Sequence, residues 1–352
     1  MRGVSARDRH LVLVVPGLCG PESDPPVSDY LQDSRPAALD HLLSRSRVVT
    51  DSGNDLDATL GQLFGLAVET GLELPVAALT WLADTGQSPA GWVMRADPVH
   101  LRADQSCLLL FDSHSFTISR EEADALVAAF NAHFRDMGWE LTAPLPQHWY
   151  LSLPQPPSLQ TLPPARVAGQ DIDPCLPRGA DAARWHTLLN EIQMLFHTHP
   201  VNAEREQRGA PPVNSIWPWG GGRLPGVLRP RATRLLADHP LATGLARHAG
   251  VSFARLPATV GELLALPGDG RTLLVDDRLE WPMHYADIET WLDTLQALEA
   301  DWFAPLLAAL RDGALATLEI YPCKGRSFHL NRGCLRRFWK PVRPYEERCQ
   351  AR

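Results

Sequence analysis

Residues 199–222 read HPVNAEREQRGAPPVNSIWPWGGG, a stretch that concentrates prolines, glycines and side-chain amides directly after a helix predicted over 183–197. Such residues favour turns, because proline fixes one backbone dihedral, glycine adopts positive φ and asparagine bonds to nearby backbone groups. The stretch therefore predicts a fixed, non-repetitive loop. Within it we expect the side chains of Asn202, Arg205 and Asn214 to hydrogen-bond to backbone groups that lack ladder partners.

The size and composition of the chain set the expected class of protein. It has 352 residues, of which 45% are hydrophobic and 21% charged, as is typical of globular proteins. This length exceeds the needs of one small core, so we expect two domains or one large domain with an insertion. The formal net charge of −8 argues against a general nucleic-acid binder, because neutralising phosphates requires a basic surface.

The cysteines and the N-terminal region bear on location. The six cysteines form no C-x-x-C pair, which argues against a structural zinc site and fits reduced thiols in the cytoplasm. The apolar run 11–15 could belong to a secretory signal, but it breaks at Pro16 and Gly17 without a small-residue cleavage site. We interpret this run as a buried strand. Since no stretch approaches about 20 apolar residues, we expect a cytoplasmic protein without a membrane span.

Hydrophobic spacing predicts strands and helices that alternate along most of the chain. We expect strands at 11–15, 92–101, 107–111, 139–142, 149–153, 272–275 and 316–320, and helices at 36–43, 58–66, 119–134, 183–197, 241–248 and 288–310. The order strand-strand-helix-strand-strand over 92–153 is typical of a compact α+β unit. The proline-rich segment 154–164 fits a return linker. The chain is therefore predicted to be an α/β protein whose sheet is interrupted by an insertion.

A family resemblance rests on the spacing in residues 199–214. They read His-Pro-x-Asn-x-x-Arg-x-x-x-Gly followed by Pro-x-Asn, which resembles archaeal-type cofactor-independent phosphoglycerate mutases of the alkaline-phosphatase superfamily. The chain also resembles the bacterial regulator-of-pathogenicity-factors E type (RpfE-type) proteins, a divergent branch of that group.

The resemblance implies a division of the chain. It implies an alkaline-phosphatase-like α/β core with a mostly parallel central sheet over 10–91 and 171–322, an inserted α+β domain over 92–170, and a basic C-terminal segment over 323–352.

The resemblance also implies a catalytic site, but this sequence lacks several of the residues that the site needs. Family enzymes use two metal ions held by Asp and His, and a Ser or Thr nucleophile. Their first Asp follows the first strand, where this chain has Pro16 and Gly17. Ser52 is the candidate nucleophile, although the surrounding Asp, Ser and Asn residues also fit a turn and helix cap.

The remaining metal positions are changed as well. Glu280 and His284 stand where the family has Asp-x-x-x-His, Glu319 and Ile320 stand where it has Asp-His, and His329 is a downstream candidate. Glu280, His284, Glu319 and His329 are too few ligands for two closely spaced ions. We therefore expect no resident cofactor; an active protein would need a divalent metal such as Mn, Zn or Mg. Retained loop residues make Asn202, Arg205 and Asn214 candidate substrate-binding residues.

Three functional readings remain open. The first is a catalytically degenerate phosphoglycerate-mutase-like protein with a regulatory or interaction role and an unknown protein partner. The second is an active mutase or phosphatase with a rearranged metal site and Ser52 as nucleophile. The third is a nucleic-acid-contacting regulator acting through residues 324–352, whose basic residues alternate with aromatic ones. Alternatively, that segment is a strap that packs its aromatics on the acidic body.

Overall fold

The computed structural model contains two compact units. The first comprises Met1–Ala67 with Val227–Arg352, and the second comprises Val68–Gly226. The structure describes residues 9–21, 23, 25–31, 34–50, 53–66, 73–104, 107–267, 270–337 and 339–349. One sheet is mostly parallel and the other antiparallel, so the predicted mixed α/β class is confirmed.

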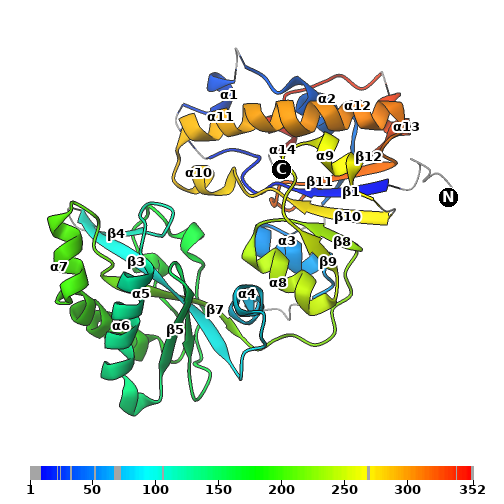
Figure 1. The fold of residues 1–352 in the computed structure, drawn as a ribbon. Helices are drawn as coiled ribbons and strands as arrows, with labels where there is room; N and C mark the ends of the chain where they lie inside the picture. The colour runs from blue at the N-terminus through cyan, green and yellow to red at the C-terminus, as the bar shows by residue number, and fades with distance from the viewer. Residues whose placement is uncertain are drawn as a thin grey trace. The chain divides into compact units, whose positions relative to one another are not determined.

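The first unit is built on a seven-stranded sheet (Figure 1). Its order is β2 (Arg47–Val49), β12 (Ser327–Asn331), β11 (Thr317–Tyr321), β1 (Arg9–Val14), β10 (Gly270–Val275), β8 (Arg234–Leu236) and β9 (Ser252–Ala254). The strands from β11 to β9 run parallel, whereas β12 is antiparallel to both neighbours. The apolar run predicted as a buried strand is β1, which lies inside this sheet. Its residues 11–14 are buried because both faces of the sheet are covered there.

Helices cover both faces of this sheet, with α11 and α12 on one side and α3 and α8 on the other (Figure 1). The helices of the unit are α1 (Val27–Tyr30), α2 (Ala37–Arg45), α3 (Leu56–Leu63), α8 (Pro240–Ala249), α9 (Val260–Ala265), α10 (Glu280–His284), α11 (Ile288–Leu298), α12 (Ala304–Asp312), α13 (Arg332–Leu335) and α14 (Tyr345–Cys349). The single helix expected over 288–310 is interrupted by a π-helical turn, Glu299–Phe303. The Glu299 carboxylate accepts hydrogen bonds from the amides of Ala38 (2.6 Å) and Leu39 (3.2 Å), which ties this turn to the start of α2.

The second unit is built on an antiparallel sheet. Its order is β4 (Cys107–Phe111), β3 (Val93–Asp104), β6 (His148–Ser152) and β5 (Glu140–Leu145), and β7 (Ser215–Gly222) also pairs with β3. Its helices are α4 (Val76–Thr85), α5 (Arg120–His133), α6 (Ala182–His197) and α7 (Pro200–Gln207), with single 3₁₀ turns at Arg135–Met137, Pro164–Arg166 and Asp173–Cys175. Apolar residues of α5 and α6 pack on one face of the sheet, and α4 packs on Val93 and Tyr150.

The loop expected over 199–222 is largely regular structure. His199 is the N-cap of α7, with Pro200 at the first helical position, where a missing N–H costs no hydrogen bond. Residues 215–222 form β7 despite Pro218 and three glycines. This strand pairs with β3, and proline is tolerated in such edge strands because its missing N–H breaks no ladder to a second neighbour.

The boundaries of the second unit differ from the expected insertion at 92–170. The compact unit runs from Val68 to Gly226, so it also contains α4, α6, α7 and β7, all of which were expected in the core. The strands expected over 92–153 pair with one another and with β7.

The basic C-terminal segment is part of the first unit. Residues 327–331 add β12 to its sheet, and Phe328 and Tyr345 are fully buried in its core. The Arg45 guanidinium donates to the carbonyls of Arg337 and Lys340. Buried rings cannot stack on nucleic-acid bases, so this packing favours the strap interpretation, although Trp339 is 68% exposed.

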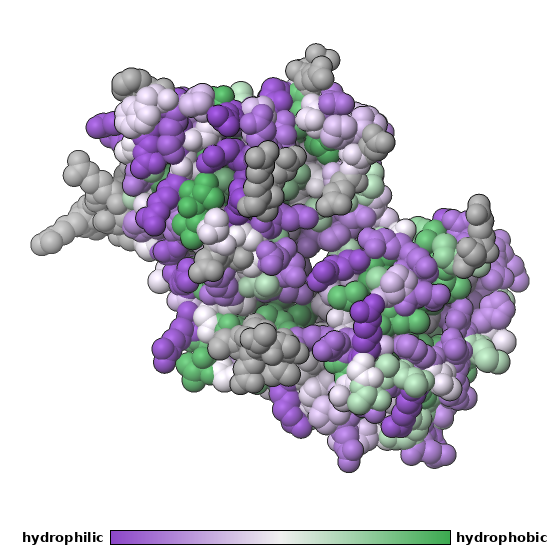
Figure 2. Space-filling model, turned by 180° about the vertical axis from the view of Figure 1, so that it is seen from behind, coloured by the Kyte–Doolittle hydropathy of each residue, from purple (hydrophilic) through white to green (hydrophobic). Residues whose placement is uncertain are grey.

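The hydropathy of the described helices and of the surface bears on whether the chain could span a membrane. Within the described ranges, no helix is both long and apolar enough to cross a bilayer. On the face drawn in Figure 2, hydrophobic residues form separate groups among hydrophilic ones.

Candidate functional site

The carboxyl ends of three neighbouring strands in the first unit form the candidate site. Strands β11, β1 and β10 end together, because Val15 N–H donates to the Tyr321 carbonyl (2.9 Å) and Asp276 N–H donates to the Val14 carbonyl (3.0 Å). Ligands of parallel α/β sheets commonly bind at this edge, because loops from several strands meet there. We call it the carboxyl edge.

Close backbone approaches hold the loops of the carboxyl edge together. Gly17 has φ +82°, and an added Cβ would lie 2.3 Å from the Leu279 carbonyl oxygen. Gly325 has φ +71°, and its amide donates to the Gly53 carbonyl at 3.0 Å. Only glycine fits both the dihedrals and the space. These contacts bring the loop before α3 to the strands.

Acidic residues gather at this edge. Asp55 and Asp57 lie at the start of α3, and Asp277 and Glu280 follow β10. Burial raises the pKa of Glu280 to about 8, and the negative charges of Asp57, Asp277 and Asp55 add to this effect. Glu280 therefore keeps its proton near neutral pH. Asp55 also caps α3, since its Oδ1 accepts from the Ala58 amide at 2.8 Å.

Two further side chains at the edge are held in inert forms. The buried Asp276 carboxylate is paired with Arg278, whose Nε and Nη2 lie 2.9 and 2.7 Å from its oxygens. Burial raises the pKa of the Cys323 thiol well above its usual range, and the charges of Glu280 and Asp55 raise it further. A thiol that stays protonated is a poor nucleophile and a poor metal ligand.

The four candidate metal ligands divide into two groups. Glu280 and His284 lie on the short helix α10, whereas Glu319 and His329 pair directly across β11 and β12. Glu319 Oε1 lies 2.5 Å from Arg271 Nη2 and 3.8 Å from His329 Nδ1. The Glu319 carboxylate is therefore already paired with the Arg271 guanidinium and is not free to bind a metal ion.

The residues present do not fit the two-metal centre that the resemblance implies. In the described part of the chain, no group of three or more His, Cys, Asp or Glu side chains is placed to hold a metal ion.

The structure changes how several predicted positions are understood. Glu319 and Ile320 lie inside β11, and Ile320 is buried in the core, so the edge is formed instead by the loop that contains Cys323. Ser52 lies outside the described residues. The sequence analysis did not include Asp277 among the candidates, although two aspartates directly after an apolar strand were a usable signal.

The three candidate substrate-binding residues form hydrogen bonds within the second unit. Asn202 Nδ2 donates to the carbonyls of Phe196 (2.8 Å) and Val213 (2.9 Å), and its Oδ1 accepts from the Val213 amide (2.8 Å). Asn214 exchanges two hydrogen bonds with the backbone of Leu101, at 2.7 and 2.8 Å. The predicted bonds from these side chains to the backbone are confirmed.

Arg205 is only 1% exposed and is held from three sides. Its Nε donates to the Pro211 carbonyl (2.7 Å), Nη2 to the Thr117 carbonyl (3.0 Å) and Nη1 to the Glu122 carboxylate (2.7 Å). Glu122 in turn belongs to the capping box that begins α5 with Ser119. Arg205 therefore has a structural role: its side chain links α7 to the loop that follows it and to α5.

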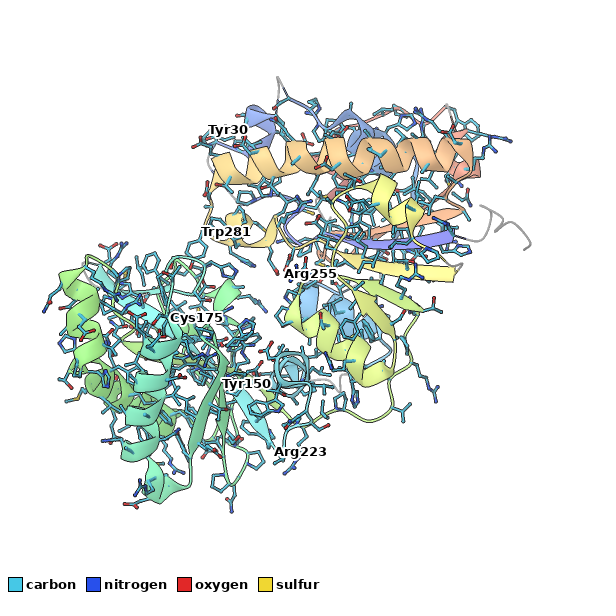
Figure 3. All side chains as sticks on the ribbon, viewed as in Figure 1. Tyr30, Tyr150, Cys175, Arg223, Arg255 and Trp281 are labelled. Carbon is cyan, nitrogen blue, oxygen red and sulfur yellow. The ribbon has the colours of Figure 1, made fainter. Side chains whose placement is uncertain are left out.

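A buried polar network lies between α4 and the sheet of the second unit. Arg95 donates three hydrogen bonds to the Asp97 carboxylate, the shortest at 2.6 Å, and one to the hydroxyl of Tyr150 (3.2 Å), a residue labelled in Figure 3. That hydroxyl donates to Asp84 (2.6 Å), which also lies 2.8 Å from His148 Nδ1. Burial would raise the pKa of Asp84, but the hydrogen bonds from His148 and Tyr150 outweigh it and lower the pKa.

Comparisons with known proteins identify what the chain is similar to. The family model for 2,3-bisphosphoglycerate-independent phosphoglycerate mutase matches residues 84–202. The protein of that name from Methanosarcina acetivorans is 32% identical over 106 residues, which cover 29% of this chain and 27% of the relative. The one from Methanothrix thermoacetophila is 27% identical over 165 residues, covering 42% of each.

A solved structure resembles nearly the whole chain. The cofactor-independent phosphoglycerate mutase from Thermoplasma acidophilum aligns with 98% of this chain and 95% of its own, at 18% identity and a TM-score of 0.44.

Together, the family model and the curated relatives indicate a family like the cofactor-independent phosphoglycerate mutases. The chain matches only 27% to 42% of the length of the two curated relatives described above. The stretch matched by the family model lies entirely within the second unit, whereas the carboxyl edge belongs to the first.

Proposed function

We propose that this chain is a catalytically degenerate relative of the phosphoglycerate mutases, with a regulatory or interaction role. In this proposal the first unit is an alkaline-phosphatase-like core, and the chain belongs to a divergent branch that resembles the RpfE-type regulatory proteins. The observation that carries the proposal is Pro16, which lies two residues after the end of β1 at the carboxyl edge. The resemblance places the first metal-binding Asp at this position, and proline offers no ligand atom.

The charge of the carboxyl edge supports the proposal. Phosphoryl transfer requires positive charge that neutralises the phosphate and activates the nucleophile. Here the side chains that act on Glu280 are Asp57, Asp277 and Asp55, all acidic. An edge of this charge repels a phosphoglycerate anion unless metal ions compensate, and the candidate ligands do not converge on one place.

The location of the family match also supports the proposal. Asn202 and Arg205 are retained because they hold α6, α7 and α5 together, which requires no catalysis. A chain that keeps this unit while its other unit loses the metal ligands retains a folded surface for a partner.

Metal binding tests the proposal. The purified full chain is incubated with Mn²⁺ or Zn²⁺, dialysed, and analysed by inductively coupled plasma mass spectrometry. We expect metal far below one ion per chain, unchanged in an Asp277→Asn/Glu280→Gln variant. Two ions per chain in the original protein, lost in that variant, would contradict the proposal.

A second candidate function is an active mutase or phosphatase with a rearranged metal site. The observation that favours it is the acidic group at the carboxyl edge, because clustered carboxylates attract divalent cations. The same experiment separates the two candidates, since this one requires tight metal binding.

A further inference from the structure

The face of the first sheet that carries α3 holds a second polar group. His329 of β12 pairs directly with Glu319 of β11 on one side and with Arg47 of β2 on the other, so the three side chains share one face. Arg271 reaches Glu319 from β10 across β1. The charge of Arg231 acts on His329 as well. We call this group the basic face; its members are Arg47, Arg231, Arg271, Glu319 and His329.

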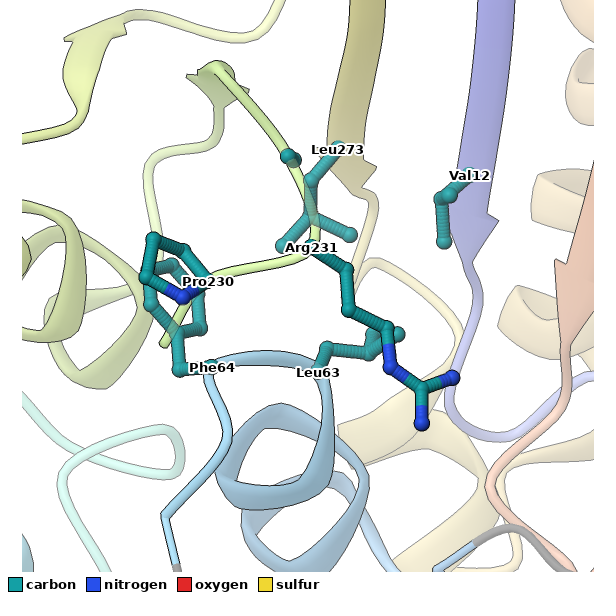
Figure 4. Close-up of a pocket in the computed structure, with 7 residues that line it drawn as sticks. Val12, Leu63, Phe64, Pro230, Arg231 and Leu273 are labelled. Atoms are coloured by element: carbon teal, nitrogen blue, oxygen red, sulfur yellow. The ribbon is translucent and has the colours of Figure 1, made fainter. Parts of the chain in front are cut away.

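The side chains of the basic face are accessible to solvent. Arg47 and Arg231 are exposed, and the side chains of Arg271 and His329 are 32% and 31% exposed. Figure 4 shows the guanidinium of Arg231 extending past Leu63 and away from Pro230 and Phe64. Its stem lines a small apolar pocket with Val12 and Leu273, which fixes the position from which the charged group extends.

The charges of the basic face do not cancel. Arg271 is compensated by Glu319, whereas neither Arg47 nor Arg231 forms a salt bridge within the described ranges. The three arginines and the one glutamate of the basic face together carry a net charge of +2.

A catalytic triad is the first alternative for this group, because Ser327 Oγ lies 2.9 Å from His329 Nε2. The geometry argues against it. Ser327 is only 1% exposed, so no substrate reaches its hydroxyl. The 3.8 Å between His329 and Glu319 is also too long for the orienting hydrogen bond of a triad.

We propose that the basic face binds a phosphate dianion, either free or as the phosphate group of a small phosphorylated molecule. Arg47 and Arg231 supply guanidinium groups, which match phosphate oxygens with paired donors. The dianion balances the net charge of the face, whereas a single carboxylate leaves one positive charge uncompensated. Arg271 lies across β1 on the same face, paired with Glu319. This site lies on the face of the sheet and adjoins the carboxyl edge, since the Tyr321 hydroxyl donates to Glu319 Oε2 at 3.2 Å. It does not depend on whether the chain is catalytically degenerate.

Isothermal titration of the full chain tests the site. Inorganic phosphate, phenyl phosphate and succinate are titrated at pH 8, where phosphate groups are dianions. We expect both phosphates to bind and succinate to bind more weakly. Comparing the first two shows whether a free ion or a monoester is preferred. Succinate binding as tightly as phosphate, or no phosphate binding at about 10 mM, a concentration that detects even weak sites, would overturn the proposal.

Arginine variants locate the site. An Arg47→Gln/Arg231→Gln variant should lose phosphate affinity by about tenfold per arginine, because charge-assisted hydrogen bonds contribute this much. Arg255→Gln is the matched control, since Arg255 is also exposed in the first unit and follows β9 (Figure 3). We expect it to bind phosphate normally. Equal losses in both variants, or none in the double variant, would refute the assignment. Circular dichroism checks that both exposed substitutions leave the fold intact.

Discussion

Replacing Asn202 with Leu should destabilise the second unit severely. The side chain is 1% exposed and connects the end of α6 to Val213, two residues before β7. Leucine has nearly the same volume, so the substitution removes the hydrogen bonds with little change in packing.

The expected loss in the free energy of unfolding depends on which backbone groups lose their hydrogen-bond partners. The Phe196 carbonyl also accepts from the His199 amide at 3.0 Å, so it stays bonded. Val213 loses the partner of both its N–H and its C=O, and it is fully buried. At about 1–3 kcal/mol for each of these two buried, unsatisfied groups, the free energy of unfolding should fall by about 2–6 kcal/mol.

Native-state hydrogen exchange followed by mass spectrometry measures this loss within the second unit. A loss of 3 kcal/mol corresponds to roughly hundredfold faster exchange of α6 peptides when opening limits protection. Asn190→Leu is the matched control, because Asn190 lies exposed on the same helix and surface changes usually stay within about 0.5 kcal/mol. Protection in Asn202→Leu equal to that of the control would refute the assigned role of these hydrogen bonds.

Three further outcomes follow from the same structure. Asn214→Leu should lower the free energy of unfolding by about 1–3 kcal/mol in urea titrations, because the N–H and C=O of Leu101 both lose a partner. Glu280→Gln should match the original protein at pH 5 and be more stable at pH 9: the folded-state pKa of about 8 lies above the unfolded value of 4.5, so stability falls as pH rises from about 5 to about 8 and levels off above that, and a neutral amide avoids this loss. Gly17→Ala should lower the melting temperature through a clash with Leu279 and a left-handed backbone, at a cost of about 1–3 kcal/mol; an unchanged melting temperature would show that the loop can move apart.

The sequence predicted the elements whose signals are local. The apolar run of β1 and the helical spacing predicted over 119–134 each depend on neighbouring residues, and both elements, β1 and α5, are present in the structure. β7 was missed because Pro218 and the following glycines are typical of turns. What permits a strand there is pairing with the long strand β3, which is a tertiary effect that local propensity does not contain.

The candidate site was predictable only in part. Pro16 could be placed at the end of the first strand from the sequence, and the structure keeps it there. Glu319 was expected just after the last strand, but it lies in the middle of β11. The end of a strand is poorly marked in an apolar segment, and a shift of a few residues moves a side chain from the carboxyl edge into the sheet. The basic face could not be predicted, since Arg47, Arg271 and His329 come from strands far apart in the sequence.

Conversion of 3-phosphoglycerate to 2-phosphoglycerate tests the central proposal most directly. The full chain is assayed with Mn²⁺ or Zn²⁺ beside a Ser52→Ala variant, which removes the candidate nucleophile. Loss of metal ligands removes several kcal/mol of barrier reduction, and each 1.36 kcal/mol is about tenfold in rate, so we expect no turnover above the variant. Metal-dependent conversion that the Ser52→Ala variant lacks would contradict the proposal and establish the rearranged-site enzyme instead.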